Sequence, residues 1–257
     1  MKRLVLCYFS PTGGTKKICD IFKKPFASEC HEIDMLLDKE FYNFTFIQDD
    51  LVIVAIPSYG GRVPSVLIPK LKMMKGNHAK AIMLCAYGNR AIDDTLLELK
   101  NTLKMANFDV VGAVSAVAKH SLFPLIASDR PNDSDRLELQ NFAKEINNCL
   151  LNGRLKEVEV PGNYPYREFH GTPFKPMAHE LCNGCGRCAE ECPSHAIDFS
   201  DLKSVNANLC ISCMHCVNIC PMHARNIDKN LQNSKYPNML ERCSEKQPNQ
   251  LFLTLNK

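Results

Sequence analysis

Eight cysteines near the carboxyl-terminal end of the chain fall into two runs with the same spacing. The first run holds Cys182, Cys185, Cys188 and Cys192, and the second holds Cys210, Cys213, Cys216 and Cys220. A proline follows the last cysteine of each run, so both read C-x2-C-x2-C-x3-C-P. This spacing binds a cubane of four irons and four sulfides through thiolates. The pattern therefore predicts two [4Fe-4S] clusters.

The ligand sets follow from the two-cluster pattern, in which the fourth cysteine of each run ligates the other cluster. The predicted sets are Cys182, Cys185, Cys188 and Cys220 for cluster 1, and Cys210, Cys213, Cys216 and Cys192 for cluster 2. Leucine, histidine and alanine also recur at equal offsets at 181/209, 195/223 and 196/224, which indicates an internal repeat of two units.

Zinc is the main alternative, because C-x2-C pairs also form tetrahedral thiolate sites. Zinc ribbons separate their pairs by about 15 to 20 residues, whereas here the third cysteine follows at once. A disulfide framework is disfavoured because the rest of the chain has the character of an intracellular protein.

Candidate strands and helices alternate over the first 151 residues. Apolar runs at 2–9, 31–36, 51–56, 79–86 and 108–118 predict strands, and 16–26, 66–74, 94–106 and 133–151 predict helices. This alternation is typical of an α/β fold, with a doubly wound parallel five-stranded sheet covered on both faces. Ligands of such sheets bind beyond the carboxyl ends of the strands.

The first predicted strand leads into Ser10-Pro11-Thr12-Gly13-Gly14-Thr15 and then into a helix. Backbone N–H groups and the positive end of the helix converge at such a loop, so we predict that it binds a phosphate. The nucleotide motif G-x4-G-K-[ST] and the dinucleotide motif G-x-G-x-x-G are both absent. A loop of Ser, Thr and Gly suits the single terminal phosphate of FMN, while a plain strand-to-helix turn is the alternative.

Two later strands end in loops that each offer a tyrosine followed by glycine, Tyr59-Gly60 and Tyr87-Gly88. A planar ring can pack on a tyrosine, and glycine lets backbone donors approach its polar edge. The predicted FMN site comprises Ser10, Thr12, Gly13, Gly14, Thr15, Pro57, Ser58, Tyr59, Gly60, Gly61, Ala86, Tyr87, Gly88 and Asn89.

These segments, FSPTGGTKK, PSYGGRVP and AYGNRAIDDTLLEL, together with the two cysteine runs, resemble the flavodoxin–ferredoxin fusion proteins of anaerobic bacteria and archaea. The resemblance implies a flavodoxin-like strand order, FMN, and a small α+β bacterial ferredoxin domain with two clusters. It also implies electron transfer as the shared role. The expected domains are 1–152 for the flavodoxin-like part and 179–228 for the ferredoxin part.

Two further segments carry fewer signals. Residues 153–178 are rich in proline, glycine and aromatics, which predicts a linker or an arm packed across the first domain. Residues 229–257 are a weakly patterned tail in which Cys243 has no predicted role.

Charge and hydropathy limit the remaining classes. The formal net charge of +3 counts thiols as neutral, and two clusters with a flavin phosphate bring it to about −3. We find no dense basic run, so we expect no nucleic-acid binding.

The start MKRLVLCYFS breaks at Ser10-Pro11 without a cleavage site, and no apolar stretch reaches the ~20 residues of a membrane span. We therefore expect a cytoplasmic protein in a reducing, anaerobic cell; the oligomeric state is open.

Three functions are compatible with these features. The first is an electron-transfer protein that passes electrons between its clusters, FMN and a redox partner protein. The second is a flavoenzyme, an oxidoreductase that reduces a small-molecule acceptor. In that case His120 is the candidate proton donor, with a structural role as its alternative, and Arg62 or Arg90 can face the reduced flavin or the solvent. The third is a redox sensor that docks to a partner.

Overall fold

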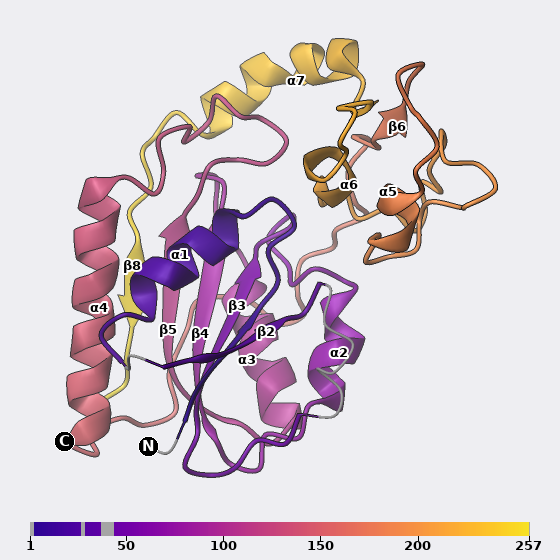
Figure 1. The fold of residues 1–257 in the computed structure, drawn as a ribbon. Coiled ribbons are helices and arrows are strands. Elements are labelled where there is room, and N and C mark those ends of the chain that lie inside the picture. Colours follow the sequence, from indigo (N-terminus) through magenta and orange to yellow (C-terminus); the bar gives the residue numbers. More distant parts are fainter. Residues whose placement is uncertain (1–2, 27–28, 37–43, 257) are drawn as a thin grey trace.

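The computed structural model describes residues 3–26, 29–36 and 44–256. In these residues a layered α/β domain carries a small cysteine-rich region at one side (Figure 1). None of the helices in these ranges is long and apolar enough to cross a membrane.

The sheet of the first domain has the strand order β2-β1-β3-β4-β5-β8. Its strands are β1 (Leu4–Tyr8), β2 (His31–Asp34), β3 (Leu51–Pro57), β4 (Lys80–Tyr87), β5 (Asp109–Val117) and β8 (Gln250–Phe252). The first five strands pair in parallel, which confirms the predicted doubly wound sheet. The order 2-1-3-4-5 is that of flavodoxin-like folds, whose switch point lies between β1 and β3.

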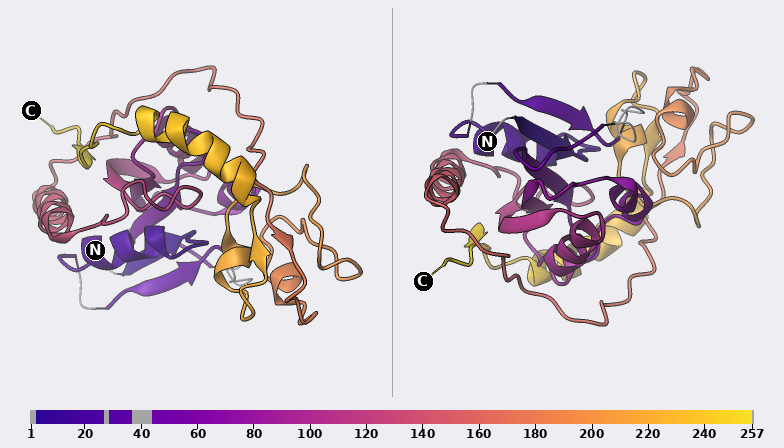
Figure 2. Two further views of the ribbon diagram at one scale, coloured as in Figure 1. Left: turned by 90° about the horizontal axis from the view of Figure 1, so that it is seen from above. Right: turned by 90° about the horizontal axis from the view of Figure 1, so that it is seen from below.

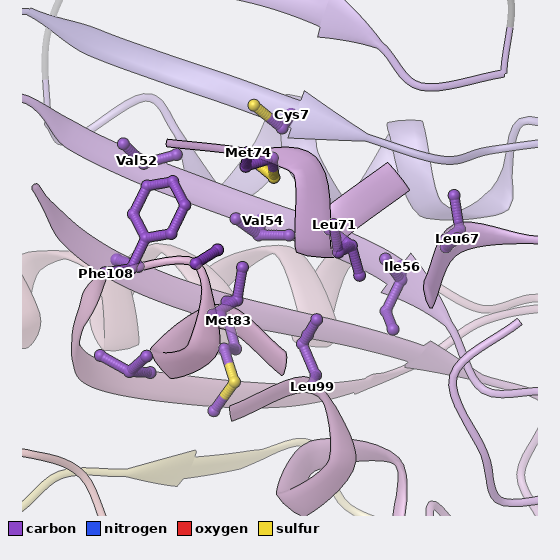
Figure 3. Close-up of a cluster of buried hydrophobic side chains, with 14 of the residues drawn as sticks. Cys7, Val52, Val54, Ile56, Leu67, Leu71, Met74, Met83, Leu99 and Phe108 are labelled. Atoms are coloured by element: carbon purple, nitrogen blue, oxygen red, sulfur yellow. The ribbon is translucent and has the colours of Figure 1, made fainter. Parts of the chain in front are cut away.

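Two helices cover each face of this sheet (Figure 2). Helices α1 (Gly14–Phe22) and α4 (Asp133–Leu151) pack on one face, and α2 (Leu67–Met73) and α3 (Thr95–Met105) pack on the other. Figure 3 shows the core under α2 and α3, where Leu71 and Leu99 meet Val54 and Met83 of the central strands. The strands β1, β3, β4 and β5 are apolar on both faces because each face is buried by helices.

The cysteine-rich region repeats its backbone geometry at an offset of 28 residues. Helix α5 (Arg187–Glu190) and helix α6 (His215–Asn218) occupy equivalent positions, and each follows a left-handed residue, Gly186 and Met214. Strands β6 (Met177–Ala178) and β7 (Arg225–Asn226) form a two-stranded antiparallel sheet. This small α+β region agrees with the predicted ferredoxin-type fold.

The last residues of the chain return to the first domain. Helix α7 (Lys229–Arg242) runs from the cysteine-rich region back across the molecule (Figures 1 and 2), and β8 then pairs antiparallel with β5. The sheet therefore has one strand more than the sequence predicts. Asn249 fixes this return, because its Oδ1 accepts a hydrogen bond of 2.8 Å from the backbone N–H of Val117.

A third apolar core joins the parts of the molecule. It combines Phe123 from the loop after β5, Phe174 from the 153–178 segment, Met214 from the second cysteine run and Cys243 beyond α7. The ring of Phe123 packs edge-on against Phe174 and Tyr236. The cysteine-rich region is thus held against the first domain by burial of apolar surface.

Candidate functional site

A pocket of about 310 Å³ lies at the carboxyl ends of the parallel strands. It is lined by residues of the loops after β1, β3, β4 and β5, the 153–178 segment, the second cysteine run and α7. Of the predicted FMN-site residues, it brings together Ser10, Thr12, Gly14, Thr15, Pro57, Ser58, Tyr59, Gly60, Ala86, Tyr87 and Gly88. This is the edge at which doubly wound sheets bind ligands.

The loop after β1 supplies hydrogen-bond donors to one wall of this pocket. Helix α1 begins at Gly14, and the first N–H groups of a helix have no acceptor within the helix. The hydroxyls of Thr12 and Thr15 lie in the same wall. The Ser10 hydroxyl accepts a hydrogen bond from the backbone N–H of Lys16 at 2.9 Å, which fixes the loop. These groups fit a phosphate.

The two tyrosines line the pocket in different ways. Tyr87 is largely buried, and its hydroxyl donates to the carbonyl of Pro248 at 3.1 Å. Burial and the nearby Cys213 thiol raise the pKa of Tyr59 well above its usual value. Tyr59 therefore lines the pocket at a point near the second cysteine run.

Close backbone approaches explain the glycines that follow these tyrosines. A Cβ on Gly60 would lie 2.2 Å from the ring of Phe169, and φ is +62° there. A Cβ on Gly88 would lie 2.6 Å from the ring of His120. Each glycine thus allows an aromatic ring of a distant segment to close the pocket.

Three residues predicted for the site lie outside the pocket lining. The Nδ2 of Asn89 donates to the carbonyls of Cys243 and Glu245, both at 2.9 Å, so this side chain holds the tail. Gly13 is the left-handed residue before α1. Gly61 packs against the side chain of Asp93.

His120 lines the pocket, and hydrogen bonds hold its ring in one orientation. Its Nδ1 accepts hydrogen bonds from the backbone N–H groups of Leu122 and Phe123, at 3.1 and 3.3 Å. Burial, with a smaller contribution from Arg90, lowers the pKa of His120 to about 4. The ring is therefore neutral at physiological pH and carries its hydrogen on Nε2. This geometry favours the structural alternative over a proton donor.

The two arginines of the predicted flavin environment have separate places. Arg62 forms a two-pronged ion pair with the largely buried Glu98, with bonds of 2.8 and 2.6 Å, and lies outside the pocket lining. Arg90 lines the pocket and is ion-paired with Asp93, which also pairs with Arg167. Only Arg90 of the two is in a position to act on a pocket ligand.

A second, smaller pocket lies among the cysteines. Cys182, Cys185, Cys188 and Cys220 line it together, the set predicted for cluster 1. Arg225 forms part of its wall and is 1% exposed. Its Nε has no hydrogen-bond partner among the described residues. A buried cationic donor without an acceptor is costly, so the site fits an anionic thiolate-bound cluster.

The cluster 2 cysteines also lie together. Burial raises the pKa of Cys213 to about 12, and the thiols that add to this rise are Cys216, Cys192 and Cys210. The backbone N–H groups of Ala196 and Ala224 each donate to the last sulfur of a run, Cys192 and Cys220, at 3.3 Å. No group of three His, Cys, Asp or Glu side chains in the described ranges is placed to hold a single metal ion.

The second cysteine run reaches the larger pocket directly. Ile211 and Ser212, between two predicted cluster 2 ligands, line it. His215 makes a further link, because its Nδ1 lies 3.0 Å from the carbonyl oxygen of Pro11 in the first loop. Its Nε2 lies 3.0 Å from a carboxylate oxygen of Glu191. Burial alone would raise the pKa of Glu191, but hydrogen bonds from Arg187 and His215 lower the pKa below its usual value. Both ring nitrogens of His215 face oxygen atoms.

Sequence reasoning alone does not find several of these residues. Arg167, Phe169 and Arg242 reach the pocket from segments with no motif. Arg225 does have a signal, since the equivalent residue of the other repeat is Ile197.

Comparisons with known proteins identify a matching family model and similar solved structures. Residues 181–225 match the model of the 4Fe-4S dicluster domain. A solved structure of a short-chain flavodoxin associated with a bacterial microcompartment is similar with a TM-score of 0.38 and 15% identity, over 56% of this chain and 95% of that chain. The comparison with the curated proteins finds no match.

The strand order and the dicluster match describe different parts of the molecule. The parallel 2-1-3-4-5 sheet belongs to the first domain, and the family match covers both cysteine runs. The chain therefore joins an α/β domain with the flavodoxin-like strand order to a segment that matches the 4Fe-4S dicluster domain.

Proposed function

We propose that this protein transfers electrons between a redox partner protein, two [4Fe-4S] clusters and one FMN. The observation that carries the proposal is the shared wall of the larger pocket. Ile211 and Ser212 of the second cysteine run and Thr12 and Thr15 of the phosphate-type loop line the same cavity. A ligand of this pocket would therefore lie beside residues that adjoin the predicted cluster 2 ligands Cys210 and Cys213, which supports electron transfer within one chain.

Different residues of the pocket would bind the phosphate and the ring of FMN. Thr12, Thr15 and the start of α1 would bind its phosphate, and Tyr59 and Tyr87 would contact its ring. FMN supplies a centre that takes one or two electrons, whereas each cluster moves one. Tyr59 lines the pocket and is close enough to Cys213 to interact with it electrostatically, so it would be near both centres.

Cluster 1 is the proposed contact point for the partner. Cys185 is exposed, whereas Cys213 of cluster 2 is buried. Leu181, which precedes Cys182, and Phe199, whose ring lies beside Gly186, are 59% and 67% exposed. Electrons would therefore enter or leave at cluster 1 and pass through cluster 2 to the flavin.

Anaerobic purification followed by iron, sulfide and flavin analysis tests the proposed cofactors. We expect eight irons, eight acid-labile sulfides and one FMN per chain, and a redox titration with two one-electron cluster couples and a flavin couple. The variant Cys185→Ser should lose one cluster and keep FMN. A colourless protein that binds zinc, or a reduced protein without cluster EPR signals, would contradict the proposal.

The flavoenzyme alternative has a separate readout. It requires steady turnover of a small acceptor with reduced ferredoxin as the electron source. That turnover should be lost in a variant of a pocket residue such as Arg90, and kept in Arg62→Lys, because Arg62 is outside the pocket lining.

A further inference from the structure

Arg225 breaks the symmetry of the two cysteine repeats. It lies 28 residues after Ile197, and both follow the alanine whose N–H donates to the last cysteine sulfur of its run. Both side chains are buried, with 1% and 5% exposure. The second repeat thus carries a cationic side chain, Arg225, where the first repeat carries the aliphatic side chain of Ile197.

The contacts of Arg225 hold its guanidinium group beside the cysteines predicted for cluster 1. Nη1 lies 3.4 Å from the sulfur of Cys188 and 2.8 Å from the carbonyl oxygen of Leu202, and Nη2 lies 2.7 Å from the carbonyl oxygen of Ser204. Nε is buried and unpartnered within the described residues. The same side chain lines the pocket formed by the four predicted cluster 1 cysteines.

A buried cation beside a cluster changes the free energy of cluster reduction through its electrostatic interaction with the cluster. Reduction adds one electron, supplied by an external reductant, and takes the unit of cluster and four thiolates from about −2 to about −3. A buried guanidinium stabilises the more negative state more than the less negative one, because Coulomb energies are large where water is excluded. Hydrogen bonds to cluster sulfurs act in the same direction.

We infer that Arg225 raises the reduction potential of the cluster bound by Cys182, Cys185, Cys188 and Cys220 more than that of the other cluster. Its direct sulfur contact is with Cys188 of the first set, and its charge also acts on Cys216 of the second set. The inference rests on the cluster assignment proposed above. In this role Arg225 tunes the potential of the cluster electrostatically and does not contact a substrate.

Other charges nearby are arranged differently. Arg187 also lines the cluster 1 pocket, but it is 53% exposed at its side chain and paired with Glu191. Near cluster 2, Lys175 donates to the carbonyl of Cys210 at 2.6 Å, and His215 is paired with Glu191. The inference therefore concerns the effect of Arg225 on its own cluster, and it sets no order between the two potentials.

EPR-monitored potentiometric titration of the anaerobic holoprotein tests this effect. We expect Arg225→Met to reduce the equilibrium constant for reduction of one cluster about tenfold, which is ~59 mV for a one-electron couple. Arg225→Lys keeps the charge and should give a smaller shift. Arg187→Met removes an exposed charge from the same pocket and should move neither couple by more than about twofold.

Iron content separates failure of the inference from failure of the cluster assignment. If Arg225→Met retains eight irons and neither couple moves, or both move equally, the inference is wrong while the clusters stand. If Arg225→Met loses iron, Arg225→Lys and Arg225→Gln provide the comparison, and a potential in Arg225→Gln equal to that of the unaltered protein would overturn the inference. If the unaltered protein contains no clusters, the proposed function itself fails.

Discussion

His120 illustrates how a single side chain can contact a candidate cofactor pocket while serving the fold. Its Nδ1 closes a turn by accepting two backbone N–H groups, and its ring fills the space that Gly88 leaves open. The sequence shows a histidine after a strand, but it cannot show which nitrogen is occupied. For this reason the proton-donor hypothesis and the structural one could not be separated from the sequence.

The lowered pKa of His120 predicts a pH-dependent stability. The unfolded chain binds a proton with a pKa of 6.5, whereas the folded chain binds it only near pH 4. The stabilising contribution is complete above about pH 6.5 and is lost as the pH falls toward 4. Between about pH 7.5 and pH 5 we expect the free energy of unfolding to fall more in the unaltered protein than in His120→Asn, by roughly 1 kcal/mol after allowing for partial exposure. Denaturant unfolding at each pH measures this difference.

His170→Asn is the control for this comparison, because the side chain of His170 is exposed. It should follow the unaltered protein at every pH. Parallel curves for the unaltered protein and His120→Asn would show that the ring is not held neutral by the fold.

At the scale of elements, α6 is the contact between the two domains at the candidate site. His215 in its first turn donates to the carbonyl of Pro11, and Glu191 holds the other ring nitrogen. Pro11 itself lines the larger pocket. The geometry of the second cysteine run is therefore tied to the loop that would bind the phosphate.

Replacing His215 should weaken flavin binding. In His215→Leu the Pro11 carbonyl loses its buried donor, and leaving a buried hydrogen-bonding group without a partner costs about 1 to 3 kcal/mol. We expect FMN to bind roughly tenfold more weakly, measured by fluorescence quenching on titration into flavin-free protein. His170→Leu is the matched control and should bind FMN normally. Equal affinities for both variants, at unchanged iron content, would rule out this coupling.

The elements that the sequence predicted best are those with strong local patterns. All five parallel strands and helix α4 lie close to their expected residues. For β1, β3, β4 and β5 the reason is an apolar run buried on both faces, and for α4 it is a periodic apolar stripe. Helix α7 contains no buried residue and holds Pro237, and β8 has only three residues. Their positions depend on contacts with Asn89 and Val117 far away in sequence, so no local pattern marks them.

The candidate site divides in the same way. The glycine loops and both cysteine runs have motifs whose spacing is set by the ligand, and the structure gathers eleven of the fourteen predicted flavin-site residues at one pocket. Asn89 could not be excluded from the sequence, because its partners are backbone carbonyls of the tail. The repeat did contain the signal for Arg225, as a mismatch with Ile197.

At the scale of the whole molecule, the proposed centres form a series from the surface inward. The exposed Cys185 lines the smaller, cysteine-lined pocket, the buried Cys213 belongs to the second cysteine set, and Ile211 near Cys213 lines the larger pocket. The apolar core of Phe123, Phe174 and Met214 keeps these parts in contact. Electron transfer inside one chain requires that they do not separate.

The rate of flavin reduction after rapid cluster reduction tests this arrangement most directly. Anaerobic holoprotein is mixed with a one-electron reductant, and the cluster and flavin absorbances are followed at several protein concentrations. The account predicts a flavin phase that follows the cluster phase with a first-order rate independent of protein concentration. A flavin phase whose rate rises in proportion to protein concentration would show transfer between molecules and would contradict the account.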